Sequence, residues 1–76
     1  MKIFNVILEC RADEKTGYFI SFDVAAPSKD DAANLALSEH KQPASVDEIA
    51  LTSEDESIDE SAVLKVYGRS YFPIAE

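Results

Sequence analysis

The alternation of apolar and polar residues over the first 24 positions is typical of β-strands. Between Lys2 and Cys10 every second position forms one apolar face, made of Phe4, Val6, Leu8 and Cys10. The polar segment RADEKTG follows and ends in Gly17, which is suited to a turn. A second alternating run, YFISFDV, has an inner face made of Tyr18, Ile20, Phe22 and Val24. The two runs predict a β-hairpin.

A helix is predicted after Pro27. Ser28 is a suitable N-cap, and Asp31 three residues later takes the place of the Glu in a capping box. Acidic residues in the first turn and the pair His40–Lys41 in the last turn suit the helix dipole. Pro43 ends the helix. Its apolar stripe consists of Ala32, Leu35, Ala36 and Leu37.

Two further strands are predicted in the second half of the chain. Residues Val46 to Thr52 form the third, with Ile49 and Leu51 as its large inward residues. Residues Ala62 to Phe72 form the fourth, where Gly68 marks a bulge or a close backbone approach. Strict alternation there puts four residues on one face: Lys65, Tyr67, Arg69 and Tyr71.

The order strand, strand, helix, strand, strand predicts an α+β fold. We expect a four-stranded, mainly antiparallel sheet with the single helix packed on one face. At 76 residues the chain is expected to be a single domain, residues 1–76. The other face of the sheet is then open to water, and the last strand displays its Lys, Arg and Tyr residues there.

Composition limits the setting in which the protein works. The chain is 46% hydrophobic, which is sufficient for a packed core. It has a single cysteine, Cys10, so it cannot form an internal disulfide, and a reducing compartment fits best. The N-terminal residues lack the features of a signal peptide, and no apolar run is long enough to span a membrane. We therefore expect a cytoplasmic protein with no membrane contact.

Negative charge is concentrated in one part of the chain. The net charge is −8, and seven acidic residues and no basic residue lie between Asp47 and Glu60. The remaining 62 residues have eight acidic and seven basic side chains, a net charge of −1. Such a local negative field disfavours direct binding to nucleic acid and favours a basic partner.

Candidate catalytic and metal-binding residues are few. Cys10 and His40 are the only pair that could serve as a thiolate and its base, and the pattern indicates no third group to orient them. We expect a buried structural cysteine and a histidine that stabilises the helix dipole, and hence no enzyme. The carboxylates of SEDESIDES lack the glycine and the spacing of a calcium loop, so we expect no metal and no cofactor.

The conformation of the acidic segment Thr52–Val63 decides whether it can act as a binding surface. Ser53 and Ser57 are each followed three residues later by Glu, which favours a short helix leading to Ala62. As a helix, residues 54–60 hold five carboxylates along about 9 Å, a charge density close to that of DNA. As an extended chain, they span roughly 20 Å. Two interpretations stay open: a compact acidic surface pinned by Ile58, or a loose solvated connection.

The arrangement resembles that of small phage or mobile-element proteins, including some anti-CRISPR proteins. The resemblance rests on a hairpin such as NVILEC...GYFISFDV that runs into an alanine-rich helix such as APSKDDAANLAL and returns through further strands. It is a resemblance of architecture and assigns no functional residue. It implies a protein without enzyme activity that covers the nucleic-acid-binding surface of a partner.

We therefore expect a small acidic inhibitor that binds a basic protein surface, which in the partner can be a site for nucleic acid. The alternative is an assembly module that forms a homodimer or joins a complex through an exposed sheet edge such as VLKVYGRSYF. The expected partner-binding residues are Asp47, Glu48, Glu54, Asp55, Glu56, Asp59, Glu60, Lys65, Tyr67, Arg69 and Tyr71.

Overall fold

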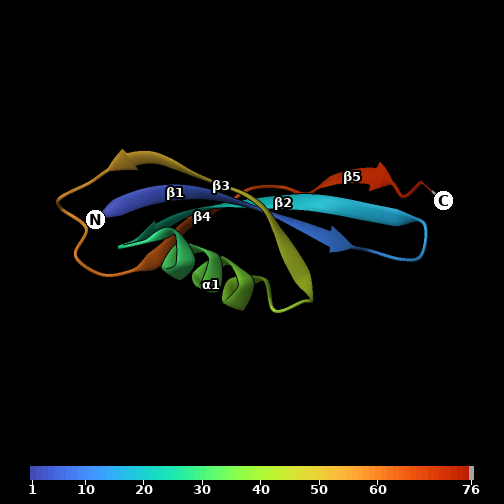
Figure 1. The fold of residues 1–76 in the computed structure, drawn as a ribbon, viewed down its shortest axis with the longest axis horizontal. Coiled ribbons are helices and arrows are strands. Elements are labelled where there is room, and N and C mark those ends of the chain that lie inside the picture. The colour runs from blue at the N-terminus through green and yellow to red at the C-terminus, as the bar shows by residue number, and fades with distance from the viewer. Residues whose placement is uncertain (76) are drawn as a thin grey trace.

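The computed structural model describes residues 1–75, which form one antiparallel sheet with a helix packed on it (Figure 1). The elements are β1 (Lys2–Arg11), β2 (Thr16–Ala26), α1 (Lys29–His40), β3 (Ala44–Glu54), β4 (Ala62–Val66) and β5 (Ser70–Pro73). The predicted α+β class and the order β-β-α-β-β are confirmed. The predicted fourth strand is divided into β4 and β5, so the described sheet has five strands rather than four.

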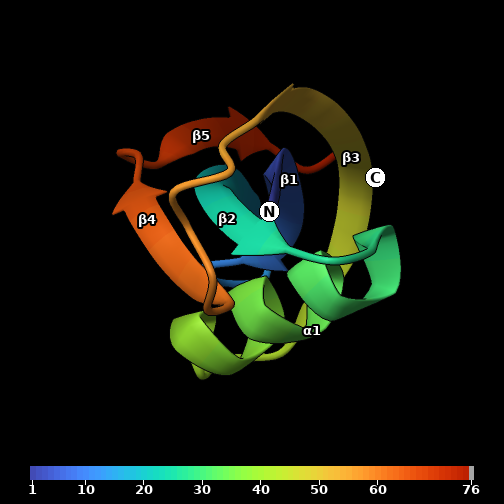
Figure 2. The ribbon, with the colours of Figure 1, turned by 90° about the vertical axis from the view of Figure 1, so that its left-hand side faces the viewer.

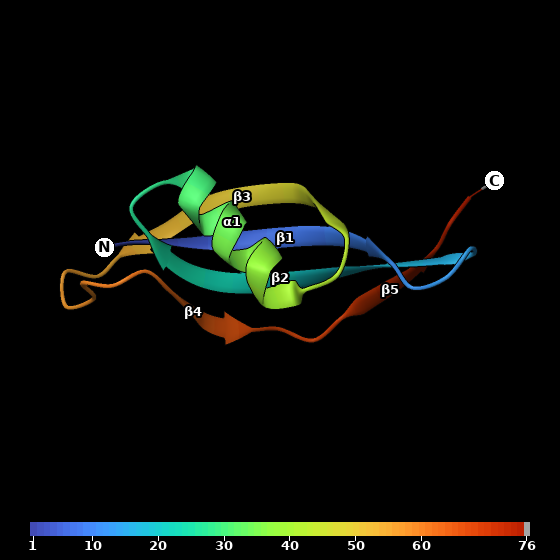
Figure 3. The ribbon, with the colours of Figure 1, turned by 90° about the horizontal axis from the view of Figure 1, so that it is seen from below.

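The strands are ordered β3-β1-β2-β4, and β5 also pairs with β2. β4 and β5 therefore follow each other along the same edge of β2, as Figure 3 shows. The hairpin of β1 and β2 has a regular register from the Lys2–Ala26 pair to the Arg11–Gly17 pair. The molecule is long and narrow, 45 × 19 × 18 Å.

The core lies between the sheet and α1 (Figure 2). The predicted inner faces of β1 and β2 are buried, and Ala32 and Ala36 of α1 have no exposed surface. Such small side chains let the helix backbone approach the sheet closely. Leu35 and Leu37 pack against the core and are partly buried. The predicted apolar stripe of the helix is therefore correct.

The predicted N-cap of α1 forms, and Lys41, expected in the last turn, is the C-cap instead. The hydroxyl of Ser28 accepts a hydrogen bond from the backbone N–H of Asp31 at 3.3 Å and donates one to the Asp31 carboxylate at 2.9 Å. At the other end Lys41 takes a left-handed conformation with a φ of 63°, and its N–H bonds to the carbonyl of Leu37. Within residues 1–75, no helix has the length and apolar character needed to cross a membrane.

The segment between β4 and β5 is one residue longer than the stretch of β2 that it faces. Tyr67 bonds through its N–H to the carbonyl of Ser21, and Ser70 pairs with Phe19. Gly68 and Arg69 together therefore lie opposite Ile20 alone, which is the arrangement of a β-bulge. No atom lies within 4 Å of a Cβ built on Gly68, so this glycine marks a bulge and not a close approach. The bulge reverses the alternation beyond it.

β3 forms the opposite edge of the sheet and is longer than predicted. Its pairing with β1 shifts register twice, which leaves Asp47 and Thr52 as extra residues. Ile49 packs against the core as expected. Leu51 does not, and this residue is 56% exposed on the edge strand.

Candidate functional site

The seven acidic residues of the segment 47–60 do not form a single group. Glu54, the last residue of β3, and the acids of the following loop lie at one end of the long molecule. Asp47 and Glu48 lie within β3, six residues or more before Glu54, which is about 20 Å along a strand. We call the first group the acidic end; its members are Glu54, Asp55, Glu56, Asp59 and Glu60.

The loop of residues 55–61 is not a helix, so that hypothesis was wrong. β3 continues in extended conformation to Glu54, and the loop then makes a single turn at residues 56 and 57. A helix would have placed like charges four residues apart, at a cost of about 0.2 to 0.5 kcal/mol for each pair. The helical density of charge that resembles DNA is therefore absent from this loop.

The first residue of the chain fixes the loop in place. The Met1 nitrogen donates to the carbonyls of Asp55 and Ile58 at 2.6 and 3.2 Å, and the N–H of Asp55 donates to the carbonyl of Met1 at 2.9 Å. Ile58 is half-buried. In Figure 2 the loop runs from the end of β3 to the start of β4 past the N-terminus. The acidic end is thus attached to the sheet. The attachment consists of hydrogen bonds to Met1 and not of the predicted helix docked through Ile58.

A turn centred on Asp55 shapes the loop further. The Asp55 carboxylate accepts hydrogen bonds from the backbone N–H of Ser57 at 2.9 Å and from its hydroxyl at 2.6 Å. The side-chain bond from Ser57, followed by the backbone bond, lowers the pKa of Asp55 below its ordinary value of 3.8. Ser57 was expected to cap a helix, and it supports the turn instead. The other four carboxylates of the acidic end belong to exposed residues.

The predicted surface of Lys65, Tyr67, Arg69 and Tyr71 is split between the two faces of the sheet, because the bulge reverses the alternation. Lys65 pairs with Asp23 on the face away from α1, and its ammonium lies 4.6 Å from the centre of the Tyr67 ring. The Tyr67 hydroxyl donates to the Asp23 carboxylate at 2.5 Å, and this bond raises the pKa of Tyr67.

Arg69 and Tyr71 lie on the helix side. Tyr71 pairs with the buried Tyr18, and their ring centres are 5.5 Å apart. The Arg69 guanidinium lies 4.5 Å from the centre of the Tyr18 ring. The expectation of one shared face for the four residues was therefore wrong, and the two pairs cannot contact the same flat surface.

A cluster that sequence reasoning missed joins Cys10, Tyr18 and His40. His40 Nε2 lies 3.3 Å from Cys10 Sγ and 3.0 Å from the Tyr18 hydroxyl. The sequence indicated no third group beside Cys10 and His40, and the structure places the Tyr18 hydroxyl at the same His40 nitrogen that faces Cys10. The hairpin was predicted without a register, and it is the observed register that pairs Cys10 with Tyr18.

The surroundings of this cluster shift two of its pKa values. Burial lowers the pKa of His40 below 6.5, and the nearby Arg69 charge lowers it further. Burial is also the main cause that raises the pKa of Tyr18 above 10.0, with Cys10 adding to the shift. The neutral imidazole and the neutral phenol are therefore favoured around neutral pH.

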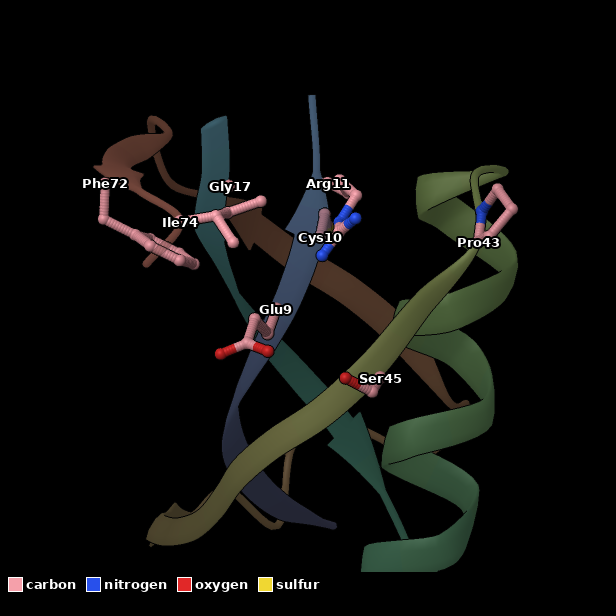
Figure 4. Close-up of a pocket in the computed structure, with 8 residues that line it drawn as sticks. All are labelled: Glu9, Cys10, Arg11, Gly17, Pro43, Ser45, Phe72 and Ile74. Carbon is pink, nitrogen blue, oxygen red and sulfur yellow. The ribbon is translucent and has the colours of Figure 1, made fainter. Parts of the chain in front are cut away.

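A hollow of about 300 Å³ lies around the paired ends of β1 and β2, away from the acidic end (Figure 4). Glu9 and Arg11 of β1 line it with opposite charges, and Phe72 and Ile74 line it from β5 and the residue that follows. None of the predicted partner-binding residues is among those that line it. The hollow and the acidic end are separate features.

Among residues 1–75, no group of three or more Cys, His, Asp or Glu side chains is arranged to hold a metal ion. The chain matches no protein-family model, no curated protein and no solved structure. The function therefore has to be argued from the geometry described above.

Proposed function

We propose that the protein is a small, non-enzymatic binding protein whose acidic end contacts a basic surface of a partner protein. The observation that carries the proposal is the attachment of the acidic loop to Met1, which holds five carboxylates at one end of a narrow molecule. A loop that is ordered before binding loses less conformational entropy on association. Concentrated negative charge also speeds the encounter with a basic partner.

A basic protein surface of this kind often serves to bind nucleic acid, so the contact would make the protein an inhibitor of that binding. An anti-CRISPR-like role, as expected from the sequence, would be one form of this inhibition.

Two variants with the same net charge test it. The first neutralises the acidic end by Glu54→Gln, Asp55→Asn, Glu56→Gln, Asp59→Asn and Glu60→Gln. The second neutralises five exposed acids elsewhere: Glu9→Gln, Asp13→Asn, Glu14→Gln, Asp30→Asn and Glu39→Gln. Each changes the net charge from −8 to −3. Asn at position 55 keeps the oxygen that accepts from Ser57.

The tagged protein and both variants are used to capture partners from host lysate at low and at high salt. We expect the wild type and the second variant to retain a basic protein at low salt and release it at high salt, and the first variant to lose it. Equal capture by both variants would contradict a role for the acidic end, because only the position of the charges differs.

A second candidate function, a homodimer or assembly module, is supported by the edge that β4 and β5 form. Leu64, Val66 and Tyr71 are 47%, 49% and 59% exposed along it. Exposed apolar side chains on an edge strand favour pairing with another chain. The β3 edge is less suited to pairing, because it contains two register shifts and the charges of Asp47 and Glu48.

Light scattering after size exclusion, over a range of concentrations, tests this second candidate. We expect a dimer in the wild type and a monomer in Val66→Lys. Leu51→Lys, on the opposite edge and 56% exposed, is the matched control and should stay dimeric. A wild-type monomer at every concentration would contradict the dimer.

A further inference from the structure

A second hollow, of about 290 Å³, lies where the acidic loop reaches β4 and faces α1. Its lining consists of Asp31, Asn34, Leu35 and Ser38 of α1 and of Ser61, the last residue of the acidic loop. The helix residues follow Asp31 at three, four and seven positions, so they form one stripe along the helix. Ser61 therefore connects the hollow to the acidic end.

Both walls of this hollow are held in place by the rest of the molecule. Leu35 packs against the core, and its neighbour Ala36 has no exposed surface, so the core fixes the helix stripe. On the other wall the Ser61 hydroxyl donates to the Met1 sulfur at 3.7 Å. Met1 also bonds to the acidic loop through its nitrogen. A side chain that enters the hollow meets a surface that needs little ordering.

The lining combines one carboxylate with several neutral acceptors. The Asp31 carboxylate accepts a hydrogen bond from the Ser28 hydroxyl at 2.9 Å and retains lone pairs for a further donor. The Asn34 amide and the hydroxyls of Ser38 and Ser61 belong to exposed residues and can also accept. None of the five lining residues is basic. The hollow therefore suits a cation with several donors.

We propose that this hollow binds an arginine side chain of the basic partner. A guanidinium has five N–H donors in one plane, matches a carboxylate such as that of Asp31, and packs its apolar stem on a side chain such as Leu35. A lysine ammonium is a compact, strongly hydrated charge with three donors, so it uses fewer of these acceptors. The inference rests on the proposed function, because it names the side chain that anchors the partner attracted to the acidic end.

A small probe tests the hollow without the partner. Isotope-labelled protein is titrated with N-acetyl-arginine methylamide and separately with the lysine equivalent, each of which has one positive charge. With the arginine probe we expect saturable shifts of the amide signals of the residues that line the hollow, and with the lysine probe weaker shifts of the same signals. Equal responses to the two probes, or shifts confined to residues 54–60, would overturn the proposal.

Two single substitutions locate the charge that binds the probe. Asp31→Asn removes the negative charge from the hollow and keeps the oxygen that accepts from Ser28. Asp30→Asn removes the same charge from the adjacent residue of the first turn, which does not line the hollow. Asp31→Asn should weaken binding of the arginine probe about tenfold, and Asp30→Asn should leave it nearly unchanged. Equal affinities in the two variants would overturn the proposal.

The capture experiment separates this inference from the proposed function. We expect Asp31→Asn to retain less of the basic partner than Asp30→Asn does. If neutralising residues 54–60 abolishes capture but these two single variants capture equally, the arginine site is overturned and the proposed function stands. If the wild type binds the arginine probe in the hollow but the acidic-end variant captures as well as its control, the proposed function fails and the arginine site stands.

Discussion

At the scale of single residues, Gly17 of β2 leaves room for the ring of Phe72, its partner in β5. A Cβ at this position would be 2.5 Å from the end of the Phe72 ring, which packs on the glycine and on Phe19 at a ring-centre distance of 4.8 Å. An aromatic ring over a glycine replaces the packing that the glycine itself lacks. Gly68, the other glycine, has open space around it.

Gly17→Ala should therefore destabilise the protein, and Gly68→Ala should not. Overpacking of this kind costs about 1 to 3 kcal/mol, whereas surface substitutions usually stay within about 0.5 kcal/mol. Urea unfolding of both variants measures the difference. Equal free energies of unfolding for the two variants would show that the contact between Phe72 and Gly17 contributes nothing.

At the scale of elements, the end of α1 is joined to the sheet by His40, which contacts Cys10 and Tyr18. Burial, together with the nearby charge of Arg69, lowers the pKa of His40. Because the folded protein binds this proton more weakly than the unfolded chain, the stabilising contribution is complete above the ordinary pKa of 6.5. It is lost as the pH falls through the lower pKa of the folded protein.

The free energy of unfolding should therefore decrease when the pH is lowered from about 7 through the folded pKa of His40. His40→Gln cannot titrate and should lose this part of the pH dependence. Urea unfolding over this pH range, for both proteins in metal-free buffer, provides the measurement. A pH slope that is the same in His40→Gln and wild type would contradict the assignment to His40.

The conformation of the acidic loop of residues 55–61 can also be tested. Its turn depends on the two hydrogen bonds that the Asp55 carboxylate accepts from Ser57. Asp55→Ala removes both, and Asp55→Asn keeps the oxygen acceptor while it removes the charge. Faster hydrogen exchange of the Ser57 amide is expected in Asp55→Ala and not in Asp55→Asn. Rapid exchange in all three proteins would mean that the turn does not persist in solution.

At the scale of the whole molecule, the architecture could be predicted from the sequence, but the arrangement of residues on the surfaces could not. The period of two in β1 and β2, the Ser28 cap and the small alanines of α1 depend on local chemistry, and all three were predicted correctly. The pattern placed either a bulge or a close backbone approach at Gly68 and did not decide between them, so strict alternation was assumed and the faces of Arg69 and Tyr71 were misassigned. The bonds from Met1 to the acidic loop join positions more than 50 residues apart, and no local pattern indicates them.

Negative charge is distributed unevenly over the molecule. Five carboxylates lie at one end, and the segment 47–60 that contains them has no basic residue. The field of such an end extends over about one Debye length, about 8 to 10 Å at moderate ionic strength. An approaching basic surface is therefore attracted mainly to this end, and the attraction decreases as salt is added.

We propose that the acidic end guides the protein to its partner. The most direct measurement is the association rate constant with the captured, purified partner as a function of ionic strength. We predict that the rate constant falls steeply with salt for the wild type and for the control variant neutralised elsewhere, and much less for the variant neutralised at residues 54–60. The same steep dependence in all three proteins, or none in the wild type, would contradict the claim.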